Sequence, residues 1–274
     1  MATTMEWRDE TGKAWAQLYS VTDRAFAGLT QRLLERLAAL PGDSILDIGC
    51  GAGELSLALA RARPHAQIVG VDVSDDLVDA ARTRGSQRFN ARFEKCDAAR
   101  WEPGESARPD LLVSRHGVMF FDDPVGAFTH LQDIAAADAH LTFSCFRSPA
   151  GNPWASEAAR VLDLAPPADP YAPGPFAFAD EERVRSILSK AGWRDIVLEP
   201  VDFAFVTGVG DDPVADSMQF YRHIGPASRA MKQQDEISQA VTLAKLEKWL
   251  RERRAADILA FPAQAWIVSA RKRG

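Results

Sequence analysis

A glycine-rich turn between an apolar strand and an amphipathic helix is the feature that most limits how this chain can fold. Residues 45–54 read Ile-Leu-Asp-Ile-Gly-Cys-Gly-Ala-Gly-Glu, and apolar side chains recur at helical spacing directly after them. Glycines in such a turn let a ligand approach the backbone closely at the start of a helix. The turn therefore predicts the first strand and helix of an open α/β sheet, with a ligand site between them.

The alternation of strand and helix continues through residues 41–145 and predicts a mostly parallel sheet. Parallel strands need crossover connections, which place helices on both faces of the sheet. We expect an α/β fold with a Rossmann-like, mostly parallel seven-stranded sheet, helices on both faces and a helical cap. The expected strands span residues 44–48, 67–71, 92–95, 110–113, 141–145, 193–206 and 258–271.

The same pattern divides the chain into consecutive regions. We expect an N-terminal helical lid over residues 1–40 and a Rossmann-like, cofactor-binding core over residues 41–147. Residues 148–207 supply a loop, a helix and a strand that complete the sheet. Residues 208–256 form a helical cap insertion, and residues 257–274 form the final strand. Helices from these separate stretches can assemble over the carboxyl ends of the strands, where open α/β sheets bind their ligands.

Charge and cysteine content exclude several classes of function. The formal net charge is −6, and nucleic-acid binding leaves a basic footprint, so no nucleic-acid partner is expected. Cys50, Cys96 and Cys145 lie in apolar stretches without CxxC spacing, which indicates reduced thiols rather than disulfides or zinc ligands. No metal is implied, because no cluster of His, Asp and Glu has ligand spacing. Without a signal peptide or an apolar run of about 18 residues, we expect a cytoplasmic protein with no membrane partner.

The glycine turn departs from the dinucleotide-binding fingerprint. That fingerprint, G-x-G-x-x-G, would require glycine at position 54 when counted from Gly49, but the third glycine is Gly53. Glu54 would also repel a pyrophosphate, whereas its carboxylate suits a ligand that carries a positive charge and an amino group. The sequence therefore disfavours a nicotinamide cofactor.

Two more carboxylates follow the next strands in order. Asp72 directly follows the second expected strand, 23 residues after Gly49, where a carboxylate offers two acceptor oxygens to the hydroxyls of a ribose. Asp97 lies two residues beyond the third expected strand. A lone acid at a strand end is most often a turn or helix cap. Together with Asp47, however, these acids mark three successive strands, and this favours a nucleotide site.

The first of these motifs resembles that of the class I S-adenosylmethionine-dependent methyltransferases, which has the form D-x-G-x-G-x-G. Asp47, Gly49, Gly51 and Gly53 match it in full. The resemblance implies S-adenosyl-L-methionine as the cofactor. It also implies that the glycines make room for the methionine part and that Asp47 reaches the ammonium group, directly or through water.

The motif after the third strand extends the resemblance. In the family, this position gives a carboxylate to the adenine amino group and directs the next backbone N–H toward the ring, and Asp97 and Ala98 match it. The residues expected to bind the cofactor are Asp47, Gly49, Cys50, Gly51, Gly53, Asp72, Val73, Asp97, Ala98, Ser114 and Trp15.

Segments beyond the fourth and fifth strands resemble a bacterial small-molecule subgroup. In its core this subgroup is similar to the ubiquinone/menaquinone C-methyltransferases, and the resemblance covers roughly residues 5–205. The subgroup has an N-terminal segment with two tryptophans, like Trp7 and Trp15 here. One departure is the turn at residues 136–140, which lacks the glycines that the family usually has there.

Two adjacent residues point to the acceptor side. His116 follows the fourth strand directly, so its imidazole is a candidate base or substrate contact, provided that its pKa is near neutral. The alternative is that the ring packs beneath the cap helices. Arg115 is a candidate contact for an anionic substrate.

Aromatic residues supply further candidates. Trp7, Trp15 and Tyr19 can form a lid over the positively charged sulfonium, or Trp15 and Tyr19 can be core residues at helical spacing. Tyr19 is also a candidate substrate contact. The helical insertion offers Tyr221 and His223 as weaker candidates for the same role.

We therefore expect S-adenosylmethionine-dependent methyl transfer to a small-molecule acceptor, on an oxygen, nitrogen or carbon atom that the sequence leaves open. The transfer can rely on positioning and on exclusion of water, with a base needed only if the acceptor must lose a proton. Two alternatives stay open: a non-methylating reaction that uses the sulfonium only as a charge, and a non-catalytic regulatory module that binds the cofactor. The sequence also leaves a homodimer open.

Overall fold

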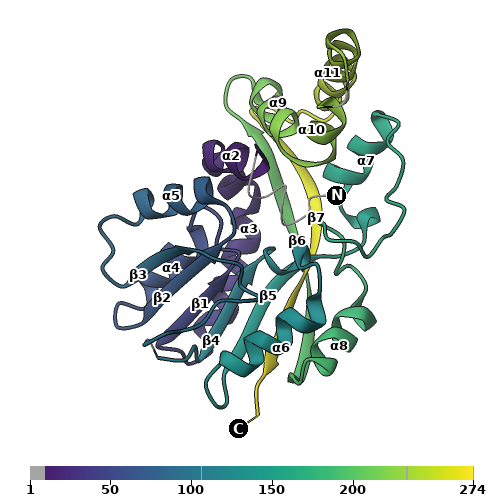
Figure 1. Cartoon of the computed structure of the whole chain (residues 1–274). Coiled ribbons are helices and arrows are strands. Elements are labelled where there is room, and N and C mark those ends of the chain that lie inside the picture. Colours follow the sequence, from purple (N-terminus) through teal and green to yellow (C-terminus); the bar gives the residue numbers. More distant parts are fainter. Residues whose placement is uncertain (1–9, 106, 233, 274) are drawn as a thin grey trace.

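The computed structural model describes residues 10–105, 107–232 and 234–273, which fold around one twisted sheet (Figure 1). Its strands lie in the order β3-β2-β1-β4-β5-β7-β6. The first five pair in parallel, whereas β7 runs antiparallel to β5 and β6. The predicted mostly parallel, seven-stranded fold is therefore confirmed. The strands span Ser44–Ile48 (β1), Gln67–Asp72 (β2), Ala91–Lys95 (β3), Leu111–Arg115 (β4), His140–Phe146 (β5), Arg194–Val209 (β6) and Ile258–Arg271 (β7).

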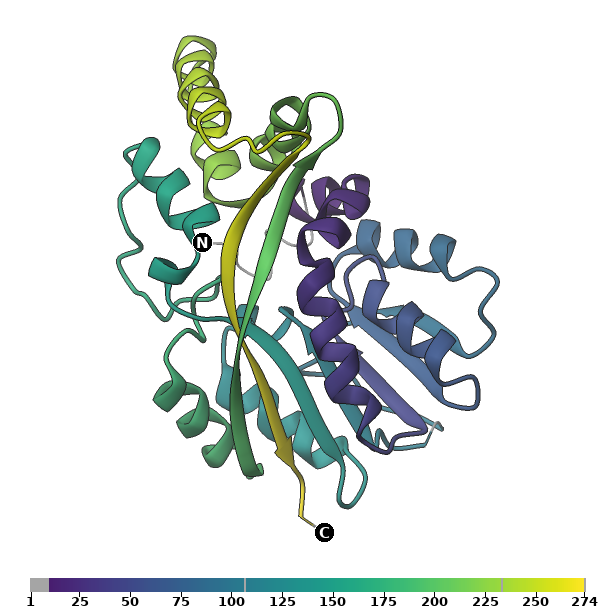
Figure 2. The ribbon, with the colours of Figure 1, turned by 180° about the vertical axis from the view of Figure 1, so that it is seen from behind.

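Helices cover both faces of the sheet, as parallel connections require. In Figure 1, α6 (Pro124–Ile134) and α8 (Glu181–Lys190) lie in front of the sheet. Figure 2 shows the opposite face, where α3 (Tyr19–Ala38) and α4 (Glu54–Ala62) pack. With α5 (Asp75–Arg84), helices α4 and α6 form crossovers between parallel strands.

Leucines at helical spacing fix α3 to the sheet. Leu29, Leu33 and Leu37 recur every four residues and have no exposed surface. Burial of each side chain contributes roughly 2 kcal/mol. The first turns of α3 are thereby held at the carboxyl edge of the parallel strands, where Thr22 and Asp23 reach a cavity.

The turn before β5, at residues 136–140, forms without a glycine. Asp138 adopts the left-handed conformation, with φ +60°. Asp tolerates this conformation better than most residues, because its short polar side chain can hydrogen-bond locally. The departure at residues 136–140 thus changes the residue in the turn and leaves β5 in register with β4.

Helices from three stretches of the chain lie over the carboxyl ends of the parallel strands (Figure 1). Strands β6 and β7 contain 16 and 14 residues and extend beyond the others to carry part of this cap. The helical stretch expected over residues 208–256 contains α9, α10 and α11. The cap helices are α2 (Glu10–Gln17), α7 (Pro153–Val161), α9 (Pro213–His223), α10 (Gly225–Met231) and α11 (Glu236–Arg251), and short 3₁₀ turns span Val118–Phe120 and Pro149–Gly151.

The structure also shows the state of the cysteines and the character of the helices, on which the sequence raised expectations. All three cysteines are free, with Cys50 and Cys145 buried and Cys96 half-buried. Among the described residues, no helix has the length and apolar character needed to cross a bilayer.

Candidate active site

A cavity lies between the carboxyl edge of the parallel strands and the cap. Turns after β1, β2, β3 and β4 form one wall, and side chains from α2, α3, α7, α9 and α10 form the other. The structure brings together at this cavity the following predicted site residues: Trp15, Asp47, Gly49, Cys50, Gly51, Asp72, Val73, Ala98, Arg115, His116 and His223.

The glycine turn brings the backbone to the cavity wall. Gly51 has φ +54°, and a Cβ built on it would meet no other atom within 4 Å, so this position leaves space for a ligand. Gly53 has φ +83°, and a Cβ there would lie 3.0 Å from the Phe93 ring and 3.1 Å from Ala81. Packing against Phe93 and Ala81 therefore requires glycine at position 53, and its predicted contact with the cofactor stays a prediction.

Asp47 places a buried carboxylate at the same turn. Its Oδ2 accepts a 2.5 Å hydrogen bond from the Ser56 hydroxyl, whereas Oδ1 has no partner among the residues that the structure describes. Burial raises the pKa of Asp47 to about 6, although the Ser56 bond and the Arg115 charge oppose the shift. A cationic group in the cavity would both supply the missing partner and favour the ionised form.

Asp72 ends β2 at the adjacent position on the wall. Its two oxygens accept hydrogen bonds from the backbone N–H groups of Gly51 (2.9 Å) and Ser74 (3.0 Å). Burial raises its pKa despite these bonds. Each carboxylate oxygen has a second lone pair, so Asp72 can still accept hydrogen bonds from a pair of hydroxyls.

Two other residues predicted to bind the cofactor do not line the cavity. Asp97 caps the turn after β3, where its carboxylate accepts a 3.0 Å bond from the N–H of Ala99, while its neighbour Ala98 lines the cavity. The hydroxyl of Ser114 donates to the Ile48 carbonyl (2.6 Å) and accepts from the N–H of Gly117 (3.1 Å). Ser114 therefore connects the turns after β1 and β4, and its predicted contact with the cofactor stays a prediction.

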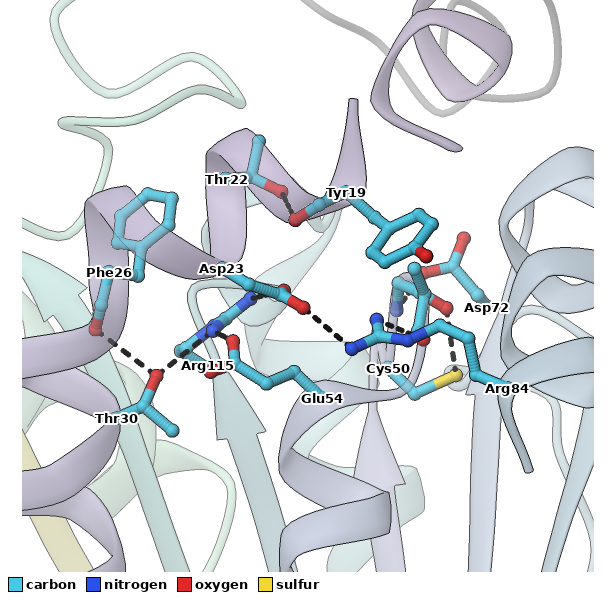
Figure 3. A network of polar contacts seen from close by, with 12 residues as sticks. Tyr19, Thr22, Asp23, Phe26, Thr30, Cys50, Glu54, Asp72, Arg84 and Arg115 are labelled. Atoms are coloured by element: carbon cyan, nitrogen blue, oxygen red, sulfur yellow. Dashed lines mark hydrogen bonds and ion pairs between the residues drawn. The ribbon is translucent and has the colours of Figure 1, made fainter. Parts of the chain in front are cut away.

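Arg115 lies in a network of charges beside the cavity (Figure 3). Its guanidinium pairs with Glu54 and lies 3.7 Å from the carboxylate of Asp23. Burial lowers the pKa of Arg115, and the nearby acids oppose this shift. These acids compensate the charge of Arg115, which lines the cavity and was predicted to contact an anionic substrate. Glu54 is likewise neutralised within the protein rather than by a ligand.

Asp23 is the centre of this network, and no motif in the sequence singles it out. Besides its contact with Arg115, it forms a 2.6 Å ion pair with Arg84. Arg84 in turn donates a 2.7 Å hydrogen bond to the carbonyl of Ala52 in the glycine turn. Asp23 therefore connects α3 to the backbone that faces the cavity (Figure 3).

Two predicted substrate contacts do not line the cavity. Tyr19 lies outside it, with the Arg84 guanidinium 4.3 Å from its ring centre. Tyr221 is buried, and its hydroxyl donates a 2.9 Å hydrogen bond to the Trp154 carbonyl. The substrate contacts predicted for these two residues stay predictions. Trp15 does line the cavity, whereas Trp7 lies outside the described residues.

His116 lines the cavity in an unusual conformation and environment. It has φ +63°, is 8% exposed, and stacks on the Phe146 ring at 4.2 Å. Neither ring nitrogen has a hydrogen-bond partner within the described ranges. Burial and the Arg115 charge lower its pKa to about 3, so the imidazole is neutral at physiological pH. This corrects the expectation of a near-neutral pKa and makes His116 a weak base.

Sequence comparison relates the core of the chain to known proteins. Residues 45–138 match the family model described as a methyltransferase domain. Trans-aconitate 2-methyltransferase from Variovorax paradoxus is 37% identical over 93 residues, which are 34% of this chain and 34% of the relative. Aklanonic acid methyltransferase from a Streptomyces species is 28% identical over 146 residues, which are 50% of this chain and 66% of the relative. Both relatives are matched over less than two thirds of their length.

Structural comparison agrees with this result. Phosphoethanolamine N-methyltransferase 2 from Haemonchus contortus, in complex with phosphomonomethylethanolamine and S-adenosylhomocysteine, aligns with a TM-score of 0.58 and 15% identity. The alignment covers 100% of this chain and 61% of that protein. At this identity, the likeness establishes a shared fold.

Proposed function

We propose that the chain is a class I S-adenosylmethionine-dependent methyltransferase that methylates a small-molecule acceptor, because residues 45–138 match the family model described as a methyltransferase domain. The cavity supports a small acceptor, because the aromatic rings that line it beneath the cap are almost fully buried. The alternatives, a non-methylating reaction and a regulatory module, lack a specific observation in their favour.

One observation carries the proposal: the unpartnered carboxylate oxygen of Asp47 beside an open glycine turn, within the part of the chain that the structure describes. S-adenosylmethionine has an ammonium group that fits this oxygen, whereas a dinucleotide would bring a pyrophosphate to it. We assign Asp47 to the ammonium group and Gly51 to the space beside the methionine part. The residues present therefore fit the cofactor.

The remaining cofactor contacts follow from the other turns. Asp72 is positioned to accept hydrogen bonds from the ribose hydroxyls, since both of its oxygens lie at the wall with free lone pairs. Cys96 and Ala98 line the wall after β3, where we place the adenine. Trp15, from α2, also lines the cavity.

When bound, S-adenosylmethionine supplies a methyl group whose carbon–sulfur bond breaks toward sulfur as the acceptor's electron pair forms the new bond to carbon. The protein's part is to position the acceptor and to exclude water. The cap helices close the cavity over the strand ends, and the neutral imidazole of His116 can hydrogen-bond a polar atom of the acceptor.

Transfer of a deuterated methyl group from labelled S-adenosylmethionine into a metabolite extract tests the proposal. At a cofactor concentration that limits the reaction, mass spectrometry should detect a labelled product with the wild-type protein and far less of it with Asp47→Asn. Asp79→Asn is the matched control, because Asp79 pairs with Arg82 on the exposed surface of α5. A protein that binds the cofactor but labels no compound would instead support one of the two alternatives.

Finer statements about acceptor and location are also proposals. The two curated relatives are named for trans-aconitate and aklanonic acid, so acids are the first acceptors to screen. A cytoplasmic location without a nucleic-acid partner is supported by the net charge of −6 and by the three free thiols. The homodimer stays an open prediction.

A further inference from the structure

Five aromatic rings line the cavity beneath the cap. They belong to Phe26, Phe146, Trp154, Phe205 and Phe220, which come from α3, β5, α7, β6 and α9. Phe205 has no exposed surface, and none of the others is more than 4% exposed. We call these five residues the aromatic chamber. Because the proposed cofactor contacts lie at the glycine turn and after β2 and β3, the aromatic chamber is left to the acceptor.

The rings of the aromatic chamber hold one another in place. Trp154 stacks on Phe205 with ring centres 4.6 Å apart. Phe26 and Phe220 meet Phe205 edge to face, at 5.2 Å and 5.5 Å. Rings fixed in this way offer flat, rigid surfaces to a ligand. Stacking on them favours a ligand that is itself flat and unsaturated.

The ring of His116 is held at the edge of the aromatic chamber before any ligand binds. It lies parallel to the Phe146 ring, with 17° between the two planes, and meets the Phe26 ring edge to face at 5.2 Å. Its backbone N–H donates a 3.2 Å hydrogen bond to the Ser144 carbonyl on β5. The imidazole is therefore a fixed polar group in a wall that is otherwise made of rings.

Both ring nitrogens of His116 lack a partner among residues 10–105, 107–232 and 234–273. Because burial and the Arg115 charge keep the imidazole neutral, one nitrogen donates a hydrogen bond and the other accepts one. A hydroxyl can serve either nitrogen, whereas a carboxylate can only accept. A charged group is also costly to bury among apolar rings. The environment of His116 therefore favours an uncharged hydroxyl over an ionised acid.

His116 also adjoins the proposed cofactor site. The next residue, Gly117, packs against Gly49 so closely that a Cβ on Gly49 would lie 2.8 Å from the Cα of Gly117. Gly49 is the first glycine of the turn at which we place the methionine part of the cofactor. A hydroxyl bound to His116 would therefore lie where the aromatic chamber meets that turn.

We propose that the acceptor inserts into the aromatic chamber a flat, unsaturated ring system that carries an uncharged hydroxyl, and that this hydroxyl pairs with His116. The inference concerns only the part of the acceptor inside the aromatic chamber, so an acid group elsewhere on the molecule is compatible with it. It rests on the proposed function, because it assumes that the cofactor occupies the glycine turn.

Binding of four matched probes to the protein saturated with S-adenosylhomocysteine tests each element separately. The reference probe is 2-naphthol, which has a hydroxyl on two flat rings and is uncharged at pH 7. Naphthalene lacks the hydroxyl, 2-naphthoate has a carboxylate in its place, and decahydro-2-naphthol has saturated rings. Equilibrium dialysis at pH 7 should show 2-naphthol binding about tenfold more tightly than each of the other three.

Variants of His116 connect the hydroxyl preference to this side chain. Glycine and asparagine both tolerate the positive φ at this position, so His116→Gly and His116→Asn avoid backbone strain. His116→Gly should remove the advantage of 2-naphthol over naphthalene, whereas His116→Asn, which keeps a donor and an acceptor, should retain part of it. His65→Gly is the matched control, because His65 lies in the exposed turn before β2, outside the cavity, and should leave the advantage unchanged.

A variant of the aromatic chamber connects the preference for flat rings to its lining. Phe205→Leu replaces the ring on which Trp154 stacks, so it should reduce the advantage of 2-naphthol over decahydro-2-naphthol severalfold. Phe143→Leu is the matched control, because Phe143 is equally buried but does not line the cavity. Comparing two probes within one variant cancels any loss of packing that affects both probes.

The outcomes separate this inference from the proposed function. Equal affinity for all four probes, tighter binding of 2-naphthoate than of 2-naphthol, or no binding of any probe to the S-adenosylhomocysteine complex would overturn the assigned acceptor class alone. A full hydroxyl preference in His116→Gly would overturn the role of His116. Failure of S-adenosylhomocysteine itself to bind would overturn the proposed function, and with it this inference.

Discussion

The two ends of the cavity are built in different ways. At the glycine-turn end, Asp47, Asp72 and Ala98 lie at or just beyond the ends of three neighbouring parallel strands, within one short stretch of the sequence. At the other end, the aromatic chamber takes one ring from each of five elements, from Phe26 in α3 to Phe220 in α9. The first end is polar and its carboxylates are held by local hydrogen bonds, whereas the second is apolar and held by ring packing.

This difference has a structural cause: the geometry of the sheet places the acids, whereas the aromatic rings come together only when the whole chain has folded. Parallel strands bring their carboxyl ends to one edge, so short motifs suffice to place the acids there. The aromatic chamber exists only after the cap has packed onto the sheet. We therefore expect substitutions at the two ends to affect cofactor and acceptor binding separately.

The largest effect is expected for Asp47→Asn. Loss of a buried charge that pairs with an ammonium group should weaken binding of S-adenosylmethionine about 100-fold. The same change should stabilise the ligand-free protein at pH 8 by about 1–3 kcal/mol, because burial holds the pKa of Asp47 at about 6 and the ionised form is costly there. Calorimetry and chemical denaturation measure the two effects. Unchanged cofactor affinity would contradict the assignment of Asp47.

The pH dependence of cofactor binding should report the same carboxylate. The folded pKa of Asp47, about 6, is above its usual value of 3.8, so its protonated form contributes stability that is present below pH 3.8 and is lost as the pH rises through about 6. A cationic ligand needs the ionised form. Affinity should therefore fall about tenfold for each pH unit below 6. Asp47→Asn should flatten this dependence, and a wild-type affinity that stays constant from pH 7 to pH 5 would exclude the mechanism.

Asp23→Asn should have an intermediate effect, which we expect in the free energy of unfolding. It removes the ion pair with Arg84 and leaves the largely buried Arg115 paired with Glu54 alone. We expect a loss of about 1–3 kcal/mol in the free energy of unfolding, less than for a fully buried pair because these side chains are partly exposed. Asp79→Asn, at an exposed pair, should change stability by less than about 0.5 kcal/mol. Equal effects of the two variants in urea denaturation would remove the special role of Asp23.

The sequence was sufficient for the sheet and for part of the site. Alternation of strand and helix located the strands to within a few residues, because period and length are local properties. The positions of Asp47 and Asp72 were predictable because they follow from strand ends. The neutralisation of Arg115 was not, since its partners Glu54 and Asp23 come from two other helices.

Burial explains most of the other differences between the expectations from the sequence and the structure. His116 was expected to titrate near neutrality, but the stacking against Phe146 that desolvates it involves a residue on a different strand. Phe205 has the pattern of an ordinary core residue in a strand, and no local signal shows that its ring faces a cavity. Tyr221 was assigned to the substrate by residue type alone, whereas packing directs its hydroxyl to the Trp154 carbonyl.

The smallest expected effect concerns His116. Because burial and the Arg115 charge hold its pKa at about 3, His116 should not titrate between pH 6 and pH 9. Once an acceptor is known, the wild-type pH profile of kcat should show no break near pH 6.5. His116→Asn should leave the shape of that profile unchanged. Asn can also adopt a positive φ and retains a hydrogen-bonding group, so its effect on kcat should be less than about tenfold. A wild-type break near pH 6.5 that disappears in His116→Asn would restore the general-base role.

The separation of the two ends is tested most directly by the affinity for S-adenosylhomocysteine in two folded variants. Asp72→Ala removes the acceptor oxygens proposed for the ribose, and Phe205→Leu changes the aromatic chamber. Calorimetry should show roughly tenfold weaker binding for Asp72→Ala and wild-type binding for Phe205→Leu. Unchanged binding in Asp72→Ala, or equal losses in both variants, would contradict the account.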